Sequence, residues 1–360
     1  MMPMQQRQVL AATSLSYVLV ILDTSIVNVA LAPIAVALHS TITALQWVVG
    51  AYTLAFGGLL LVGGLLADRF GARRLYMTGL LLFTLASVLC GLADHGMTLV
   101  AARVLQGVGA ALLVPASLAL INQAYQHDPG GRAAAIGVWA GCGGVAMAAG
   151  PLVGGVLIEV LGWRSIFLAN LPLGLLAVGL TTRVAVNAAL AHGPGWGVRL
   201  ALQLFGNRAF SACVAVSLVS ALLLYGLMFL LSLYFQRTLG FSPLRTGAAF
   251  LPLTVLVSVG SLMAGKCVRA FGSRWLIGSA LLLYGTGFAL LLMSGSTPAY
   301  ALLVVPLPLI GLAAGLITPA ATAAMMNAVH PGQAGLAAGT LNTARQLGAA
   351  LGVALASGLL

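Results

Sequence analysis

Long, uninterrupted apolar segments constrain the fold of this chain more than any other feature of its sequence. A transmembrane α-helix needs roughly 20 apolar residues, and these segments are about that length or longer. A transmembrane β-barrel is excluded, because its strands alternate apolar and polar residues. We therefore predict an all-α polytopic membrane protein with about 11 transmembrane helices. The predicted segments are residues 9–31, 46–66, 75–93, 98–121, 133–158, 165–182, 209–235, 245–265, 275–294, 299–325 and 335–360.

The scarcity of charge excludes a soluble enzyme. Charged residues make up 6% of the 360 residues, whereas a soluble domain carries about 25%. The sequence contains no Walker-type phosphate loop, no HExxH and no Gly-x-Ser-x-Gly motif. Its five histidines and four cysteines have no metal-ligand spacing. We therefore expect neither an enzyme nor a bound metal or cofactor.

The net charge of +11 is explained by membrane orientation. If the N-terminus is cytoplasmic, eleven Lys and Arg residues fall in cytoplasmic loops and three in outer loops. Such a bias is the usual positive-inside signal. The charge therefore requires no nucleic-acid partner, and the expected partners are the lipid bilayer and a small-molecule substrate. A monomer is expected, although the sequence leaves the oligomeric state open.

Two segments of the chain repeat each other. Residues 64–73 (Gly-x5-Phe-Gly-x-Arg) match residues 265–274 at an offset of 201, and residues 107–115 match residues 311–319 at an offset of 204. Near-constant offsets predict two pseudo-symmetric helix bundles in the same orientation. We place a six-helix bundle at residues 1–182, a cytoplasmic linker at residues 183–208 and an incomplete five-helix bundle at residues 209–360.

Asp23 is the only acidic residue deep in an apolar segment. A carboxylate facing lipid is costly, so this side chain should face the protein interior or a wet cavity. An apolar environment disfavours its charged form, which makes Asp23 a candidate for proton coupling. The alternative is a buried polar group that fixes helix packing. Asn28, five residues along the same segment, is a candidate cavity-lining residue.

Arg103 lies near the start of the fourth apolar segment, with Gln106 on the same helical face. An arginine close to a buried carboxylate could hold it ionised until substrate or conformation moves it, so we assign Arg103 to proton coupling and Gln106 to the cavity lining. The alternative is an arginine at the membrane surface whose side chain extends to water.

The connection between the second and third segments contains Gly64, Asp68, Arg69, Gly71 and Arg73. Glycine permits a tight turn, and Asp68 could bind a helix N-terminus or an arginine across an interface. We predict a gating loop that stabilises one conformation. An ordinary basic cytoplasmic loop would explain the arginines but not the aspartate between two glycines.

The fifth segment contains Gly150, Pro151, Gly154 and Gly155. Gly150 and Gly154 form a GxxxG contact face, and a proline inside a helix removes a backbone hydrogen bond. We predict a bend that closes the outer side of a central cavity; the alternative is generic packing of small residues.

Three residues of the second half are candidate cavity-lining residues. Tyr225 and Phe229 share one helical face, although aromatic residues on one face also occur as ordinary packing. Arg345 lies in the last segment and has no acidic partner in its own half.

These motifs together resemble the major facilitator superfamily, and within it the drug:proton antiporters of the fourteen-helix multidrug efflux subfamily. The resemblance implies a secondary active transporter that exports drugs or other amphipathic or cationic small molecules in exchange for protons, by alternating access. It also implies a multi-pass protein of the bacterial inner membrane whose energy source is a proton gradient. The segments that carry the resemblance are residues 22–33, 64–74, 103–107, 150–155, 163–172 and 345–348.

The chain departs from that subfamily in length. Residues 183–208 are too few to span the membrane twice, and the sequence stops after what resembles the penultimate helix. The alternative hypothesis is therefore a shortened, transport-inactive remnant that acts as an inert or scaffold membrane protein.

Overall fold

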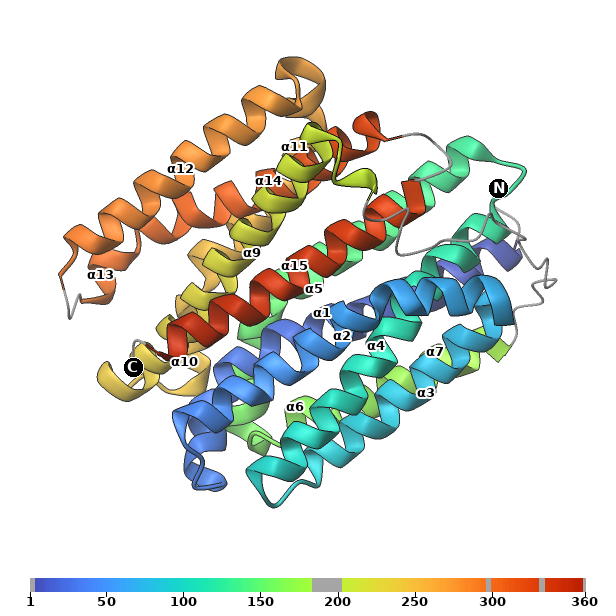
Figure 1. Ribbon diagram of the computed structural model, residues 1–360. Helices are drawn as coiled ribbons and strands as arrows, with labels where there is room; N and C mark the ends of the chain where they lie inside the picture. The colour runs from blue at the N-terminus through green and yellow to red at the C-terminus, as the bar shows by residue number, and fades with distance from the viewer. Residues whose placement is uncertain (1–3, 183–202, 296–298, 330–333, 359–360) are drawn as a thin grey trace.

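A computed structural model describes residues 4–182, 203–295, 299–329 and 334–358. All regular structure in these ranges is helical (Figure 1). The predicted linker lies outside the described residues apart from residues 203–208. The helices are α1 (Met4–Ala37), α2 (Ile42–Phe70), α3 (Ala72–Gly91), α4 (Gly96–Ala124), α5 (Pro129–Leu161), α6 (Ser165–Leu168), α7 (Asn170–Thr182), α9 (Arg208–Leu233), the π-helical turn η1 (Tyr234–Thr238), α10 (Pro243–Ala249), α11 (Leu251–Phe271), α12 (Ser273–Met293), α13 (Tyr300–Leu303), α14 (Pro306–Ala328) and α15 (Ala334–Ser357).

The prediction of an all-α polytopic membrane protein is confirmed. Among the described residues, ten helical spans are long and apolar enough to cross a membrane. The eleventh predicted span corresponds to α15, whose hydropathy is lowered by three polar residues, Asn342, Arg345 and Gln346. The sixth span consists of α6 and α7 together, separated at Ala169.

Several of the predicted segments were shorter than the helices that the structure contains. The first span was expected at residues 9–31, but α1 covers Met4–Ala37, which at 1.5 Å per residue is about 50 Å. This length exceeds the roughly 30 Å of the hydrocarbon core, so the helix extends into the polar interface. Polar residues occur there, and a run of apolar residues therefore does not reveal the ends of the helix. The segment expected at 245–265 is divided at Phe250 into α10 and α11.

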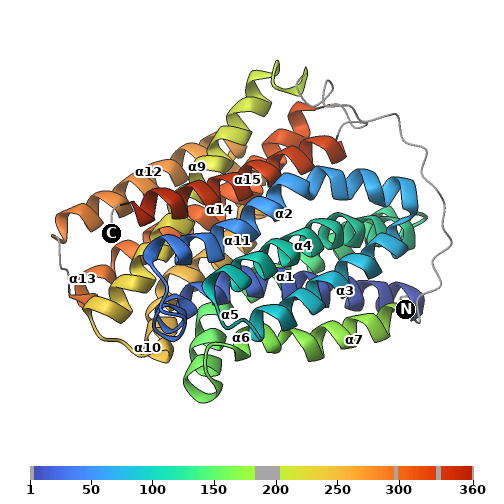
Figure 2. The ribbon, with the colours of Figure 1, turned by 60° about the horizontal axis from the view of Figure 1, so that its bottom comes forward.

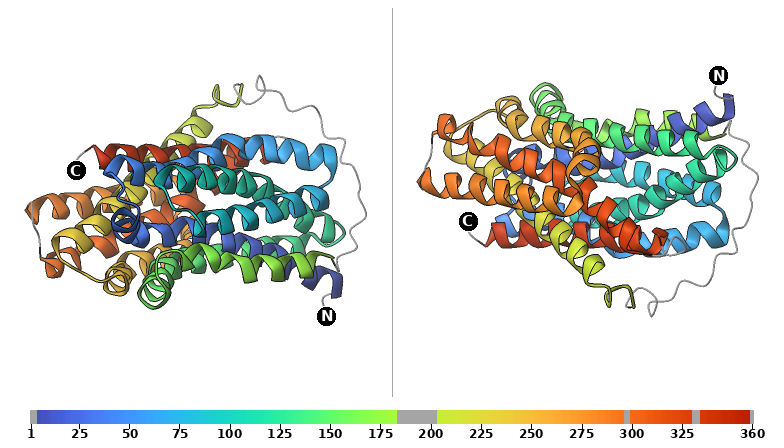
Figure 3. Two further views of the ribbon diagram at one scale, coloured as in Figure 1. Left: turned by 90° about the horizontal axis from the view of Figure 1, so that it is seen from below. Right: turned by 90° about the horizontal axis from the view of Figure 1, so that it is seen from above.

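The long helices run roughly along one axis and form two groups (Figures 1 and 2). Seen from below and from above, helices α1–α7 lie toward one side and α9–α15 toward the other (Figure 3). The groups meet where α2 packs on α15, α5 on α10 and α11, and α1 on α9.

The repeated sequence segments adopt the same local structure. Gly71 ends α2 with φ 88°, and Gly272 ends α11 with φ 79°, a region of φ that favours glycine. Gly107 of α4 lies against the carbonyl of Tyr52 in α2, and Gly311 of α14 lies against that of Leu253 in α11. Corresponding helices therefore approach each other at corresponding glycines in both groups.

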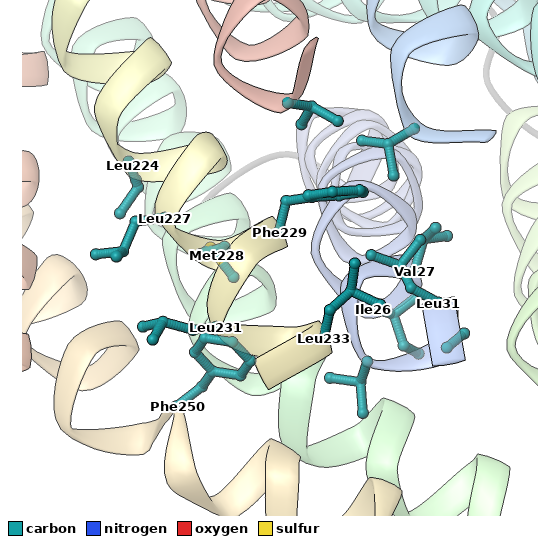
Figure 4. Close-up of a cluster of buried hydrophobic side chains, with 14 of the residues drawn as sticks. Ile26, Val27, Leu31, Leu224, Leu227, Met228, Phe229, Leu231, Leu233 and Phe250 are labelled. Atoms are coloured by element: carbon teal, nitrogen blue, oxygen red, sulfur yellow. The ribbon is translucent and has the colours of Figure 1, made fainter. Parts of the chain in front are cut away.

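An apolar cluster joins the two groups near one end of the bundle. Phe229 extends from α9 toward α1, and Leu233 lies beside Ile26 (Figure 4). Phe229 has no exposed surface, and Ile26 is 1% exposed. The cluster includes Phe250 between α10 and α11, so these helix ends share one core.

We predict that Gly311→Ala destabilises the protein whereas Gly278→Ala does not. A methyl group at position 311 would collide with the backbone of Leu253, but one at position 278 would meet no other atom within 4 Å. Overpacking costs about 1–3 kcal/mol, while alanine favours the helix. The midpoint of thermal unfolding in detergent should fall for Gly311→Ala alone; equal midpoints would contradict the close contact.

Candidate functional site

The carboxylate of Asp23 and the guanidinium of Arg103 form a buried ion pair between α1 and α4. Each residue is 1% exposed. Helix α4 begins at Gly96, so Arg103 lies about two turns inside it. The alternative that Arg103 extends to water at the membrane surface is therefore wrong for this conformation.

Both carboxylate oxygens of Asp23 accept hydrogen bonds. Oδ2 accepts from Nη1 of Arg103. Oδ1 accepts from Nε2 of Gln106 at 2.8 Å and from Nδ2 of Asn170 at 3.2 Å. Donors from α4 and α7 therefore occupy both oxygens of this carboxyl group.

Arg103 also binds groups other than Asp23. Its Nη1 donates to Oε1 of Gln106 at 2.7 Å, and its Nε donates to the carbonyl of Val48 in α2 at 3.1 Å. The guanidinium carbon lies 4.1 Å from the ring centroid of Tyr52 and 5.8 Å from that of Phe167, which allows cation–π attraction. A buried ion pair needs partners for its remaining polar atoms, and here Nε and Nη1 of Arg103 and both oxygens of Asp23 have them.

The sequence did not predict three members of this network. Ser87 of α3 accepts from Gln106 at 2.8 Å and from Asn170 at 3.2 Å. The thiol of Cys90 lies 3.5 Å from Oε1 of Gln106. Asn170 is 2% exposed at the start of α7. The signal available for it was its place in residues 163–172, one of the segments that carry the family resemblance.

The predicted gating loop has a defined backbone and one bond to a neighbouring helix. Gly71 allows the reversal between α2 and α3, and Nη2 of Arg73 donates to the carbonyl of Thr182 at the end of α7, at 3.3 Å. Arg69 is exposed and packs on Phe70. A methyl group at Gly64 would meet no other atom within 4 Å. The side chain of Asp68 lies outside the described residues, so the role predicted for it stays a prediction.

The glycines of α5 make contacts with both helix groups. Gly150 lies against Ser25 of α1, and Gly154 against Ile26. On another face, Gly155 lies against Leu244 of α10, while Gly247 of α10 lies against the carbonyl of Pro151. Helix α5 continues through Pro151. The motif therefore holds α5 close to α1 and to α10 at the same end of the bundle.

A polar contact joins α1 and η1 at this end. Pro33 lies inside α1 and has no N–H, so the carbonyl of Val29 loses its partner in the helix. Nε2 of Gln236 donates to that carbonyl at 3.0 Å. The hydroxyl of Ser232 donates to the neighbouring carbonyl of Asn28. The second group thus supplies the hydrogen bond that the proline removes.

A second polar contact joins α5 and α10. The carboxylate of Glu159 accepts from the hydroxyl of Ser242 at 2.9 Å and from the backbone N–H of Leu244 at 3.1 Å. Ser242 is the N-cap of α10. Glu159 therefore connects the end of α5 to the start of a helix in the other group.

The five predicted cavity-lining residues occupy two kinds of environment. Gln106, Asn28 and Phe229 have no exposed surface, so they line no open space in this conformation. Gln106 instead binds Asp23, and Phe229 fills the space between α9 and α1 (Figure 4). Tyr225 and Arg345 are half-buried in the middle of α9 and α15.

A cavity of about 590 Å³ lies elsewhere, at the ends of α1 to α4. It is lined by His39 and His95 of the α1–α2 and α3–α4 connections and by residues at the starts of α2 and α4, among them Trp47 and Met97. None of the predicted site residues contributes to its wall.

Comparison with known proteins identifies the family. Residues 13–353 match the family model described as Major Facilitator Superfamily. The methylenomycin A resistance protein of Streptomyces coelicolor is 33% identical, over 96% of this chain and 84% of that protein. The puromycin resistance protein pur8 of Streptomyces alboniger is 38% identical over 94% and 78%. The multidrug resistance protein Stp of Mycobacterium tuberculosis is 31% identical over 98% and 75%.

Solved structures agree with this fold. An inward-facing, unoccupied bacterial homologue of the human lysosomal transporter Spinster matches with a TM-score of 0.79 at 20% identity, over 98% of this chain and 82% of that one. The D-xylose–proton symporter matches with a TM-score of 0.79 at 16% identity, over 97% and 89%.

We predict that Asp23 and Arg103 are energetically coupled. Asp23→Asn or Arg103→Gln alone leaves a buried charge without its partner, which should cost about 3–5 kcal/mol. The double variant removes both charges, so it should lose less stability than the two single variants added together. Thermal unfolding of the three variants in detergent measures this coupling.

The matched control is Asp94→Asn. Asp94 pairs with Arg164 at 3.4 Å, but the two side chains are 81% and 43% exposed, so its loss should change stability little. Additive losses in the Asp23–Arg103 cycle would contradict the buried pair.

Proposed function

The chain belongs to the Major Facilitator Superfamily, and from this membership we propose that it exports small amphipathic molecules, drugs among them, in exchange for protons. The relatives support export, since they are named as resistance and multidrug resistance proteins. The proposed location is a bacterial plasma membrane, with the N-terminus in the cytoplasm as the distribution of basic residues predicts.

Asp23 is the proposed proton carrier. It is the described carboxylate that lies deep inside a membrane span, whereas Glu159 lies at the end of one, and its partners come from α4 and α7. A proton that reaches Asp23 neutralises it and competes with Arg103 for the carboxylate. Arg103 would then retain only neutral acceptors, such as Gln106 and the Val48 carbonyl. Protonation therefore disfavours this arrangement of α1 and α4.

Alternating access follows from a change in how the two helix groups meet. At the proposed outer end, α5 and α1 are held to α10 and η1 by close glycine contacts and by the bonds of Glu159 and Gln236. These contacts must separate for the outer side to open. A ligand or proton shifts such an equilibrium only if it binds one conformation, open to one side of the membrane, more tightly than the other. For the proton, Asp23 is the group whose affinity differs between the two conformations.

The observation that carries the proposal is the buried Asp23–Arg103 pair in a chain whose relatives confer drug resistance. We predict that cells or proteoliposomes with the wild-type protein export fluorescent dyes when a pH gradient is imposed. Asp23→Asn should reduce this efflux at least about tenfold, because the proton has no carboxylate to bind. Efflux is followed by dye fluorescence, with and without an uncoupler.

Two controls define the result. Asp94→Asn should export dye normally, and the efflux of each variant is divided by the amount of that variant in the membrane. Uncoupler-sensitive efflux that survives Asp23→Asn would refute the role of Asp23. A wild-type protein that exports none of a broad panel of dyes and antibiotics would favour the transport-inactive alternative.

A further inference from the structure

Arg345 lies in the middle of α15 and has no carboxylate partner among the described side chains. It lies eleven residues after the start of α15 and twelve before its end. An arginine at the centre of a bilayer is costly and is retained for a function by default. Its Nη1 donates to Oδ1 of Asn342 at 3.2 Å. The two ion pairs found among the described side chains join Arg103 to Asp23 and Arg164 to Asp94, so neither includes Arg345.

One tyrosine from each helix group lies near this cation. Tyr17 of α1 and Tyr225 of α9 both lie within electrostatic range of Arg345. All three side chains keep some exposed surface. The ring of Tyr17 stacks on Trp139 of α5, with centroids 3.7 Å apart, and Gly143 lies against that ring. The indole N–H of Trp139 is buried without a hydrogen-bond partner in the described structure.

Arg345 faces the protein interior, away from the lipid-facing side of α15. Leu347, Leu351 and Leu355 are exposed and lie on one side of the helix. Thr343 and Gln346 face α2, and Gly348 faces α9. A helix turns by about 100° per residue, which places Arg345 between the α2 and α9 faces. The surface that it retains therefore belongs to the space between the two groups.

The described acidic side chains do not neutralise this site. Asp23 is bound to Arg103, and the other described carboxylates, those of Asp94, Asp128 and Glu159, lie at helix ends. Position 68 lies in the last turns of α2, about 16 Å along the helix axis from Gly57, the residue that contacts Arg345's neighbour Gln346. Among the described side chains, Arg345 is therefore a positive charge without a neutralising carboxylate.

We propose that Arg345 binds the anionic group, such as a carboxylate, of an amphipathic aromatic substrate. The planar guanidinium suits bidentate contact with a carboxylate. The rings of Tyr17 and Tyr225 offer apolar and aromatic surface to the rest of the substrate, and Trp139 supports the ring of Tyr17. The inference rests on the proposed export function and narrows its substrates from amphipathic or cationic molecules to anionic ones.

Binding of two dyes with one aromatic scaffold tests the charge preference. Fluorescein is anionic and rhodamine 123 is cationic, and both carry a xanthene ring. With purified wild-type protein in detergent, we expect fluorescein to bind at least about tenfold more tightly, the effect of one charge-assisted hydrogen bond. Fluorescence anisotropy measures both affinities. Equal or tighter binding of rhodamine 123 would overturn the inference whatever the variants show.

Variants assign the preference to Arg345. Arg345→Gln should weaken fluorescein binding about tenfold and leave rhodamine 123 binding unchanged or stronger. Arg345→Lys keeps the charge and should retain most of the preference. The control Arg132→Gln removes one exposed positive charge at the start of α5 and should change neither affinity. Loss of fluorescein binding in the control as well would overturn the assignment, because net charge alone would explain it.

Efflux of the same dyes separates this inference from the proposed function. Fluorescein binding that depends on Arg345, without any dye export, would uphold the site and refute the export function. Export of rhodamine 123 but not fluorescein would uphold the export function and refute the site.

Discussion

The buried carboxylate of Asp23 is the constraint around which the first helix group is arranged. A charge in a medium of low dielectric constant is tolerated only with a partner and with hydrogen bonds to its remaining lone pairs. Arg103, Gln106 and Asn170 meet this requirement, and Ser87 and the Val48 carbonyl bind these partners in turn. Helices α1, α2, α3, α4 and α7 are thereby held in one relative arrangement, which any change in the charge of Asp23 must disturb.

Close backbone approach supplies the second constraint. Glycines at matched positions let α4 approach α2 and α14 approach α11, while the glycines of α5 contact both groups. Two polar contacts between the groups lie near the glycines at the end of α5, where Gln236 donates to the carbonyl of Val29 and Glu159 caps α10. Other hydrogen bonds join α15 to α2 and α11 to α5. The interface therefore combines tight packing with a small number of breakable bonds, as a surface that opens and closes requires.

The sequence predicted the features that have strong local signals. Charged residues within apolar segments pointed to Asp23 and Arg103, and matched spacing pointed to the repeated turns at Gly71 and Gly272. The helix ends were less predictable, because polar residues continue helices beyond the hydrocarbon core. Contacts such as Asn170 with Asp23 were not predictable, since neutral polar residues are common in helices and periodicity does not determine their partners in space.

In the proposed mechanism, Asp23 is ionised while Arg103 holds it and becomes protonated when that pair opens. Infrared difference spectroscopy tests this directly, because the chain has only five acidic residues and a protonated carboxyl absorbs separately from a carboxylate. Lowering the pH of the purified wild-type protein should produce a protonated-carboxyl band that is absent from Asp23→Asn and present in Asp94→Asn. An identical band in Asp23→Asn, or none at any pH at which the protein transports, would contradict the account.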